Sequence, residues 1–208
     1  MASFHIAFDN LDIKLGLYFE ESKTDIVNFI TGNNPNHTIN ELNSELCTVN
    51  HINECFQGSE NPYLFIAYSH GNNNCLVIKK EWYVSSPENT QNFANSFFYS
   101  MSCNTGKDMG IELIEKGCLV FIGYKSTAYA ALDEHKDLFI ECDNYGLKRF
   151  IEGSSAKNAF AEMKSNYRQA IKGLVKKKKT LLAGYLRSNL GALVFYSNND
   201  DLHFNDFN

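Results

Sequence analysis

Uninterrupted apolar runs alternate with a helical pattern along the middle of the chain. The runs Tyr63–Ser69, Phe97–Ser102 and Cys118–Gly123 are typical of strands covered on both faces. Between the last two, GKDMGIELIEKG has the length and apolar spacing of a helix, with Asp108 near its start and Gly117 at its end. This strand–helix–strand order predicts a right-handed crossover within a parallel sheet.

The other elements are predicted from the same kinds of pattern. Strands are expected at Phe4–Phe8 and Ile13–Phe19, in a small hairpin of Leu76–Ile78 with Glu81–Val84, and at Leu181–Leu186 and Ala192–Tyr196. Helices are expected from Thr38, which has capping-box spacing to Glu41, as far as Gly58, over 130–152, and from the Ser cap of GSSAKNAF to Leu174. Residues 198–208 are expected to form a polar, frayed tail.

Length and composition indicate a single globular domain. The 208 residues include 44% hydrophobic and 21% charged residues, which is enough for an ordinary core. Neither an internal repeat nor a long linker divides the chain. We therefore expect one domain over 1–208, in which residues 1–60 contribute N-terminal strands and a helix.

Charge and apolar run length narrow the range of partners. The net charge of −5 argues against a nucleic-acid surface, and the basic run Lys176–Lys179 is interpreted as a solvated helix end. Every apolar run is shorter than the roughly 18 residues of a membrane span, and the N-terminus does not resemble a signal peptide. The six cysteines are scattered, as is typical of reduced thiols, so we expect a cytoplasmic protein that binds neither nucleic acid nor membrane.

Two of the predicted strands end at residues that can do chemistry. Tyr63–Ser69 is followed by His70 and Gly71, and Phe97–Ser102 is followed by Cys103. Sites in parallel sheets form beyond the carboxyl ends of strands, so neighbouring strands would bring imidazole and thiol together as base and nucleophile. Because Gly71 has no Cβ, its amide and that of Cys103 can form an oxyanion hole. Taken singly, such a Cys is usually a small buried hydrophobe and a His-Gly pair a turn.

These motifs resemble those of the caspase-like cysteine proteases, which include caspases, gingipains, clostripain, separase and the bacterial CHAT proteases. The segment FFYSMSCNTGKDMGIELIEKGCLVFIGYKSTAY is most similar to the CHAT, gingipain and separase members, and FIEGSSAKNAFAEMKSNYRQA resembles a helix that they carry after a Gly-Ser turn. The resemblance covers roughly 61–196. It implies an α/β fold, a three-layer α/β/α sandwich around a mostly parallel central sheet.

The resemblance also implies an activity. The reaction would be peptide hydrolysis through a thioester acyl-enzyme, with Cys103 as nucleophile, His70 as general base and acid, and the Gly71 and Cys103 amides as oxyanion donors. A thiol protease of this type needs no cofactor, and we expect no metal. Its partners would be a protein or peptide substrate and a separate regulatory or sensor protein. Many CHAT relatives act in bacterial or antiviral defence or in programmed cell death.

Substrate preference is less well defined. Caspases carry Gln-Ala-Cys-x-Gly, and Met101 and Ser102 depart from that pattern, which argues against a caspase-type preference for Asp. In several relatives an acidic residue selects Arg or Lys, and Asp133 and Glu134 are candidates for that role, although they also suit a solvated helix start. Two alternatives remain open: a non-catalytic interaction module on the same fold, and a thiol hydrolase or acyltransferase with a non-peptide substrate.

A zinc site is poorly supported by the cysteine and histidine spacing. Cys47, His51 and Cys55 fall four residues apart, which would place them on one helical face. Because no fourth ligand is evident nearby, we interpret this set as a buried amphipathic stripe.

Overall fold

A computed structural model describes residues 1–58 and 62–207, and within them the core is a six-stranded sheet. Its strands are β1 (Ser3–Phe8), β2 (Thr38–Leu42), β3 (Tyr63–Tyr68), β7 (Ser96–Ser100), β8 (Val120–Tyr124) and β9 (Leu193–Ser197). Their spatial order is β2-β1-β3-β7-β8-β9, and all neighbours pair in parallel except β8 and β9. The predicted α/β class with a mostly parallel sheet is confirmed.

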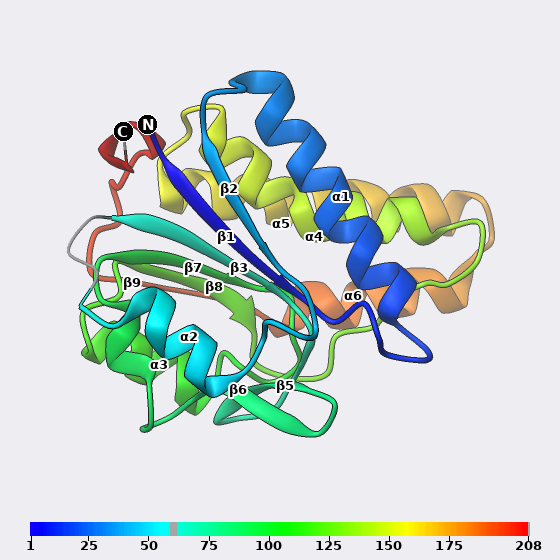
Figure 1. Ribbon diagram of the computed structural model, residues 1–208. Coiled ribbons are helices and arrows are strands. Elements are labelled where there is room, and N and C mark those ends of the chain that lie inside the picture. The colour runs from blue at the N-terminus through cyan, green and yellow to red at the C-terminus, as the bar shows by residue number, and fades with distance from the viewer. Residues whose placement is uncertain (59–61, 208) are drawn as a thin grey trace.

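Helices cover both faces of this sheet (Figure 1). One layer contains α1 (Gly16–Asn33), α4 (Lys136–Ile151), α5 (Ala156–Lys176) and α6 (Thr180–Ala192), and the opposite layer contains α2 (Val49–Phe56) and α3 (Asp108–Glu115). No helix in the described ranges is both long and apolar enough to cross a membrane. The arrangement is the three-layer sandwich that the sequence predicts.

Burial on both faces explains the uninterrupted apolar runs. Along β3, Leu64 and Ile66 pack in the core beneath α1 and α4, whereas Phe65 and Ala67 pack in the core beneath α2 and α3. Successive strand residues point to opposite faces, so both sets must be apolar when both faces are covered.

The predicted hairpin is present and extends directly from β3. It consists of β5 (Cys75–Ile78) and β6 (Glu81–Ser85), and a two-residue strand, β4 (His70–Gly71), pairs antiparallel with β5. A short 3₁₀ helix, η1 (Thr90–Phe93), then leads to β7. His70 therefore belongs to this small sheet and lies two residues beyond the end of β3.

The strand predicted at Ile13–Phe19 is wrong, because these residues lead into and begin helix α1. The side chain of Ile13 is fully exposed and Leu17 is largely exposed, while Tyr18, Phe19 and Ile26 are buried at helical spacing. The apolar composition suggested a strand, but only one helical face is covered by the sheet.

The helix predicted from Thr38 is correct only in its second half. Residues Thr38–Leu42 form the edge strand β2, which pairs with β1, and α2 begins after Thr48, whose side-chain oxygen accepts the His51 amide. Cys47 precedes this helix and is buried, whereas Cys55 is exposed with its Sγ 3.6 Å from the His51 Nε2. The predicted buried stripe of Cys47, His51 and Cys55 is therefore wrong.

Two further boundaries differ in the helical layer. The helix predicted over 130–152 begins only at Lys136, because the preceding residues form an irregular segment after β8. The strand predicted at Leu181–Leu186 is wrong, since it lies within α6, where Ala183, Leu186 and Asn189 are buried at intervals of one helical turn. Leu181 is exposed, so its apolar character does not mark a strand.

The C-terminal tail is packed rather than frayed over the described residues. It ends in a short 3₁₀ helix, η2 (Phe204–Phe207), and Leu202, Phe204 and Phe207 are all buried in the main core. The Phe204 and Phe207 rings both contact Phe150 of α4. Aromatic burial outweighs the polar composition of this segment.

Candidate active site

His70 and Cys103 lie at the same edge of the sheet because β3 and β7 are parallel neighbours. Their register pairs Ala67 with Ser100, an offset of 33 residues (100 − 67), and His70 and Cys103 differ by the same 33 (103 − 70). The Met101 amide donates to the Ala67 carbonyl at 3.0 Å, which continues the pairing beyond β7. The two residues therefore follow adjacent carboxyl ends of parallel strands.

The two residues line one small cavity of about 40 Å³. Its walls are Leu15, Tyr18, Phe19, Ser69, His70, Met101, Cys103, Ala128, Tyr129, Ala130 and Asp143. Within the described chain no hydrogen bond joins the Cys103 thiol to the His70 ring, so the groups share a cavity rather than a direct contact. Catalytic pairs often tighten only when substrate binds.

The loop between β1 and α1 orients the His70 ring. Its Nε2 lies 3.0 Å from an Asp12 carboxylate oxygen, and the Phe19 ring stands edge-on to the imidazole at 5.6 Å between centroids. A carboxylate can only accept, so we assign the proton of neutral His70 to Nε2. Nδ1 then keeps the lone pair that a general base requires.

Asp12 is itself held in place by the main chain. Its Oδ1 accepts hydrogen bonds from the amides of Lys14 at 2.8 Å and Leu15 at 2.6 Å, leaving Oδ2 for His70. Partial desolvation would raise the pKa of Asp12, but these hydrogen bonds outweigh it and lower the pKa. Asp12 is not among the site residues expected from the sequence, although an acidic residue in the turn after the first strand of a parallel sheet was a usable signal for it.

The turn between β7 and α3 presents the Cys103 thiol, which is partly exposed. Its Sγ accepts a hydrogen bond from the Ala128 amide at 3.3 Å, and the next residue, Asn104, has a φ of 63° and donates its amide to Ser126 at 3.2 Å. The Cys103 amide donates to no group in the described part of the chain. An unpaired main-chain N–H thus lies beside the thiol.

Gly71 is confined by the same turn. A Cβ at this position would lie 2.6 Å from the Thr105 methyl carbon, 2.8 Å from the Cys103 carbonyl oxygen and 3.0 Å from the Ser102 Cβ. Only a residue without a side chain lets the two backbones approach this closely. The Gly71 and Cys103 main chains are therefore adjacent, as a shared oxyanion hole requires.

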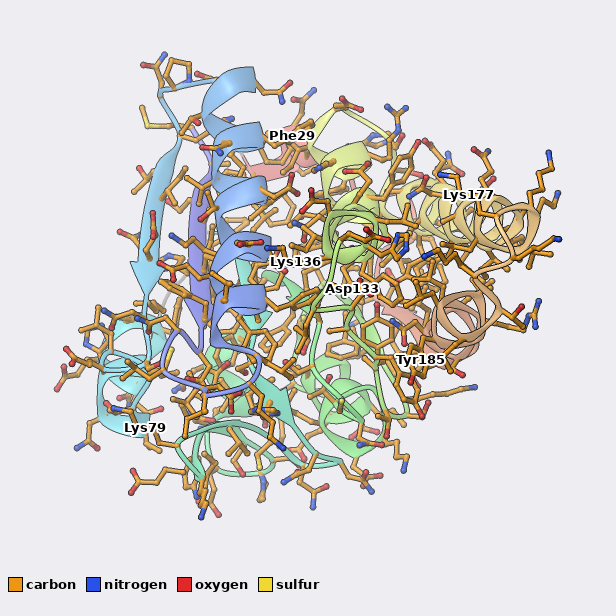
Figure 2. The ribbon with its side chains drawn as sticks, turned by 90° about the vertical axis from the view of Figure 1, so that its right-hand side faces the viewer. Phe29, Lys79, Asp133, Lys136, Lys177 and Tyr185 are labelled. Carbon is orange, nitrogen blue, oxygen red and sulfur yellow. The ribbon has the colours of Figure 1, made fainter. Side chains whose placement is uncertain are left out.

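Asp133 and Glu134 lie on the irregular segment before α4, and neither lines the cavity of His70 and Cys103. Figure 2 shows Asp133 on that segment. The Glu134 carboxylate lies 3.4 Å from both the His135 Nε2 and the Lys179 Nζ, and its side chain is 74% exposed. The structure does not bring these two acids together with the two strand-end residues.

The acid that does line the cavity is Asp143, in the middle of α4. Its carboxylate accepts hydrogen bonds from the hydroxyls of Tyr18 at 2.7 Å, Tyr124 at 2.6 Å and Tyr167. Burial raises the pKa of Asp143 although these hydrogen bonds lower it in part. Sequence analysis missed it because an acid within a helix usually faces water.

The raised pKa of Asp143 makes its effect on folding pH-dependent. Its contribution to stability is fully present below the ordinary pKa of 3.8 and is lost as the pH rises through the higher folded value. In Asp143→Asn the amide oxygen can still accept from Tyr124 and Tyr167, and the buried charge is removed. We expect the stability of this variant relative to wild type to increase from about pH 4 to about pH 7, by about 1.4 kcal/mol per unit of pKa difference.

Urea unfolding across that pH range would measure this effect. Asp137→Asn provides the matched control, because Asp137 lies on the same helix and is exposed. A constant stability difference between Asp143→Asn and wild type at all pH values would contradict the assignment.

The fold is similar to that of proteins of known structure. No family model matches the chain, and no curated protein matches it in sequence. The crystal structure of the Arg-specific cysteine proteinase gingipain R (RgpB) superimposes with a TM-score of 0.64 and 13% identity, covering 97% of this chain. The chain shares the caspase-like fold of gingipain R. The complex of Porphyromonas gingivalis RgpB pro- and mature domains matches with a TM-score of 0.58 and 11% identity over 97% of this chain.

The chain spans about half the length of these two gingipain structures, 47% and 48% respectively. At 13% and 11% identity, these structures establish the caspase-like fold alone. Of the caspase-like proteases that the sequence resembles, gingipain is therefore found among the structural neighbours.

Proposed function

We propose that this protein is a cysteine endopeptidase in which Cys103 and His70 form the catalytic dyad. The observation that carries the proposal is the β3–β7 register, which delivers an imidazole and a thiol to one cavity at the carboxyl edge of the sheet. The caspase-like fold supports it, because gingipain R is a cysteine proteinase.

In the proposed reaction Cys103 transfers its proton to Nδ1 of His70, and its sulfur attacks the carbonyl carbon of the peptide bond. The Gly71 and Cys103 amides would stabilise the oxyanion that forms. The C–N bond then breaks as His70 returns the proton to the leaving amine, which leaves a thioester on Cys103. Water activated by His70 hydrolyses the thioester and regenerates the thiol. Asp12 would hold the ring with Nδ1 facing the thiol.

The cavity beside Cys103 is the proposed subsite for the residue before the cut. At about 40 Å³ it is smaller than a long side chain, so a large residue would have to displace the segment around Tyr129. Tyr129 is tied to α6 by two 2.8 Å hydrogen bonds with the Asn189 side chain. Asp133 and Glu134, just beyond this segment, remain the proposed selectors of a basic substrate residue at the outer rim.

Control of the enzyme is proposed to come from a separate regulatory or sensor protein, with a role in bacterial defence or programmed cell death. A neighbouring structure contains a protease together with its pro-domain, which is a precedent for control by a protein partner. No cofactor enters the proposed reaction.

A peptide library combined with a thiol-reactive substrate analogue tests the proposal. We expect cleavage of a subset of peptides, detected by mass spectrometry, and labelling of Cys103 faster than of Cys55, although Cys55 is the more exposed thiol. Preferential labelling of Cys55 without peptide cleavage would favour the non-catalytic interaction module. Hydrolysis of small thioesters or esters without peptide cleavage would favour the non-peptide hydrolase.

A further inference from the structure

We propose that Asp9, Asp12 and His70 form a binding site for Zn²⁺, and that bound Zn²⁺ prevents His70 from acting as the general base. The inhibitory part of this inference rests on the proposed function, but the binding of the ion does not. One ligand atom from each of the three side chains lies within 4.8 Å of the others. An imidazole and two carboxylates are ligands that zinc prefers.

The three residues are brought together by the main sheet. Asp9 directly follows β1, and its amide donates to the Tyr68 carbonyl at the end of β3 at 3.0 Å. Asp12 follows in the next turn, and His70 lies two residues beyond β3. Asp9 and His70 therefore lie just beyond the ends of two adjacent parallel strands, and Asp12 lies in the loop between β1 and α1.

In each carboxylate, Oδ1 accepts hydrogen bonds from neighbouring groups, whereas Oδ2 is the oxygen that could bind the ion. In Asp9, Oδ1 accepts from the Ser44 hydroxyl at 2.8 Å and the Leu11 amide at 3.3 Å, whereas Oδ2 accepts no hydrogen bond from the described residues. In Asp12, Oδ1 accepts hydrogen bonds from two main-chain amides, and among the described residues Oδ2 has a hydrogen bond only to His70, which a bound ion would replace. Such supporting hydrogen bonds are those that orient metal-binding carboxylates. Asp9 is only 2% exposed, so its carboxylate is held firmly.

The ion and its water ligands would have room. All three residues line a second cavity of about 460 Å³, together with Leu11, Ile13, Val77, Lys79 and Lys80. Cys103 does not line this cavity. Water can therefore complete the coordination of a three-ligand site.

The composition of the site selects the kind of ion. Lys79 and Lys80 are exposed at the rim, and Figure 2 shows Lys79 at the outer end of the hairpin. Their positive charge opposes the binding of every cation, so the occupant has to gain enough from direct bonds to its ligands. Ca²⁺ and Mg²⁺ require six or more oxygen ligands, whereas Zn²⁺ gains from direct bonds to one nitrogen and two oxygens. Zn²⁺ is therefore the expected occupant.

Bound Zn²⁺ would prevent His70 from acting as the general base, because it would change which ring nitrogen carries the proton. Zn²⁺ bonded to Nε2 takes the lone pair there, so the proton of the neutral ring moves to Nδ1 through solvent. Nδ1 then becomes an N–H donor and cannot accept the Cys103 proton. The switch needs neither a redox step nor a bond to the thiol.

Calorimetric titration with Zn²⁺ tests the site on the Cys103→Ala variant, which needs no catalytic activity. We expect this variant to bind one Zn²⁺, and the added Asp9→Asn change to weaken binding by more than about 100-fold. The asparagine side chain retains an oxygen for the Ser44 and Leu11 hydrogen bonds, and thermal unfolding checks that the variant folds. Asp137→Asn is the matched control and should bind normally. Unchanged Zn²⁺ affinity in the Asp9→Asn variant would overturn the site.

The catalytic consequence is tested separately on the protein with its thiol intact. Zn²⁺ should inhibit peptide cleavage reversibly, with recovery on chelation, and Asp9→Asn should require more than about 100-fold more Zn²⁺ for the same fractional inhibition. If Zn²⁺ instead bridges Cys103 and His70, binding would be lost in Cys103→Ala and kept in Asp9→Asn, which would overturn the proposal. Zinc binding without any peptide cleavage would leave the site standing and refute only the proposed protease.

Discussion

Replacing Cys103 with alanine is expected to abolish peptide cleavage, lowering the rate by a factor on the order of 10⁵ or more. The sulfur is the atom that would form the thioester, and the alanine side chain has no nucleophilic atom. Continuous peptide hydrolysis assays with the best library substrate would measure the loss. Because the Cys103 thiol makes hydrogen bonds only to Ala128 within the described residues, the unfolding free energy should change by roughly 1 kcal/mol or less.

The matched control for this change is Cys55→Ala. Cys55 is an exposed thiol that also lies near an imidazole, with its Sγ 3.6 Å from the His51 Nε2. Its removal should leave the rate unchanged, since it lies on α2, away from the edge of the sheet where β3 and β7 end. A Cys103→Ala protein that still cuts the same substrate would refute the assigned nucleophile.

Replacing Asp12 with asparagine is expected to lower kcat on the order of 10³-fold. The main-chain amides of Lys14 and Leu15 bind Oδ1, so the amide oxygen of the new side chain should occupy that position. Its NH₂ group then faces Nε2 of His70, where Oδ2 now lies 3.0 Å away. A donor at that position forces Nε2 to accept and moves the ring proton to Nδ1, which removes the lone pair intended for Cys103.

Asp12→Ala distinguishes this tautomer effect from a simple loss of packing. Alanine removes the hydrogen bond that holds the His70 ring but permits either tautomer. We therefore expect a smaller loss of kcat, about ten- to one-hundredfold. The ring NMR shifts of His70 would report the inverted tautomer in Asp12→Asn alone. Equal activity losses in the two variants, or an unchanged tautomer, would show that Asp12 does not position the ring.

The strand ends and the residues that follow them were predictable because the signal is local. Tyr63–Tyr68 and Ser96–Ser100 are buried on both faces, which requires continuous apolar residues, and the residues that follow such strands lie at the carboxyl edge of a parallel sheet. His70, Gly71 and Cys103 could thus be selected from sequence position. The hairpin after His70 and helices α3 and α5 were predictable for the same reason.

Local patterns failed where an apolar segment can fold in two ways. Ile13–Phe19 and Leu181–Leu186 both have strand-like composition, yet each belongs largely to a helix with one exposed side. The exposed Ile13, Leu17 and Leu181 show that apolar residues in these segments are not all core residues. The surface on which such a segment packs decides whether it forms a helix, with a repeat of about 3.6 residues, or a strand, with a repeat of two.

Which acids lie around His70 and Cys103 was decided by tertiary structure alone. Asp12 is 58 residues from His70, and Asp143 is 125 residues from Tyr18, so no spacing rule connects the members of either pair. Chain order and apolar pattern specified which strand tips carry the imidazole and the thiol. The packing of the first loop and of α4 against the sheet decided the rest: which carboxylate orients that imidazole, which carboxylate is buried among tyrosines, and which side chains lie close enough to share a metal ion. Hydrogen bonds and metal ligation act over a few ångströms in space, regardless of the distance along the chain.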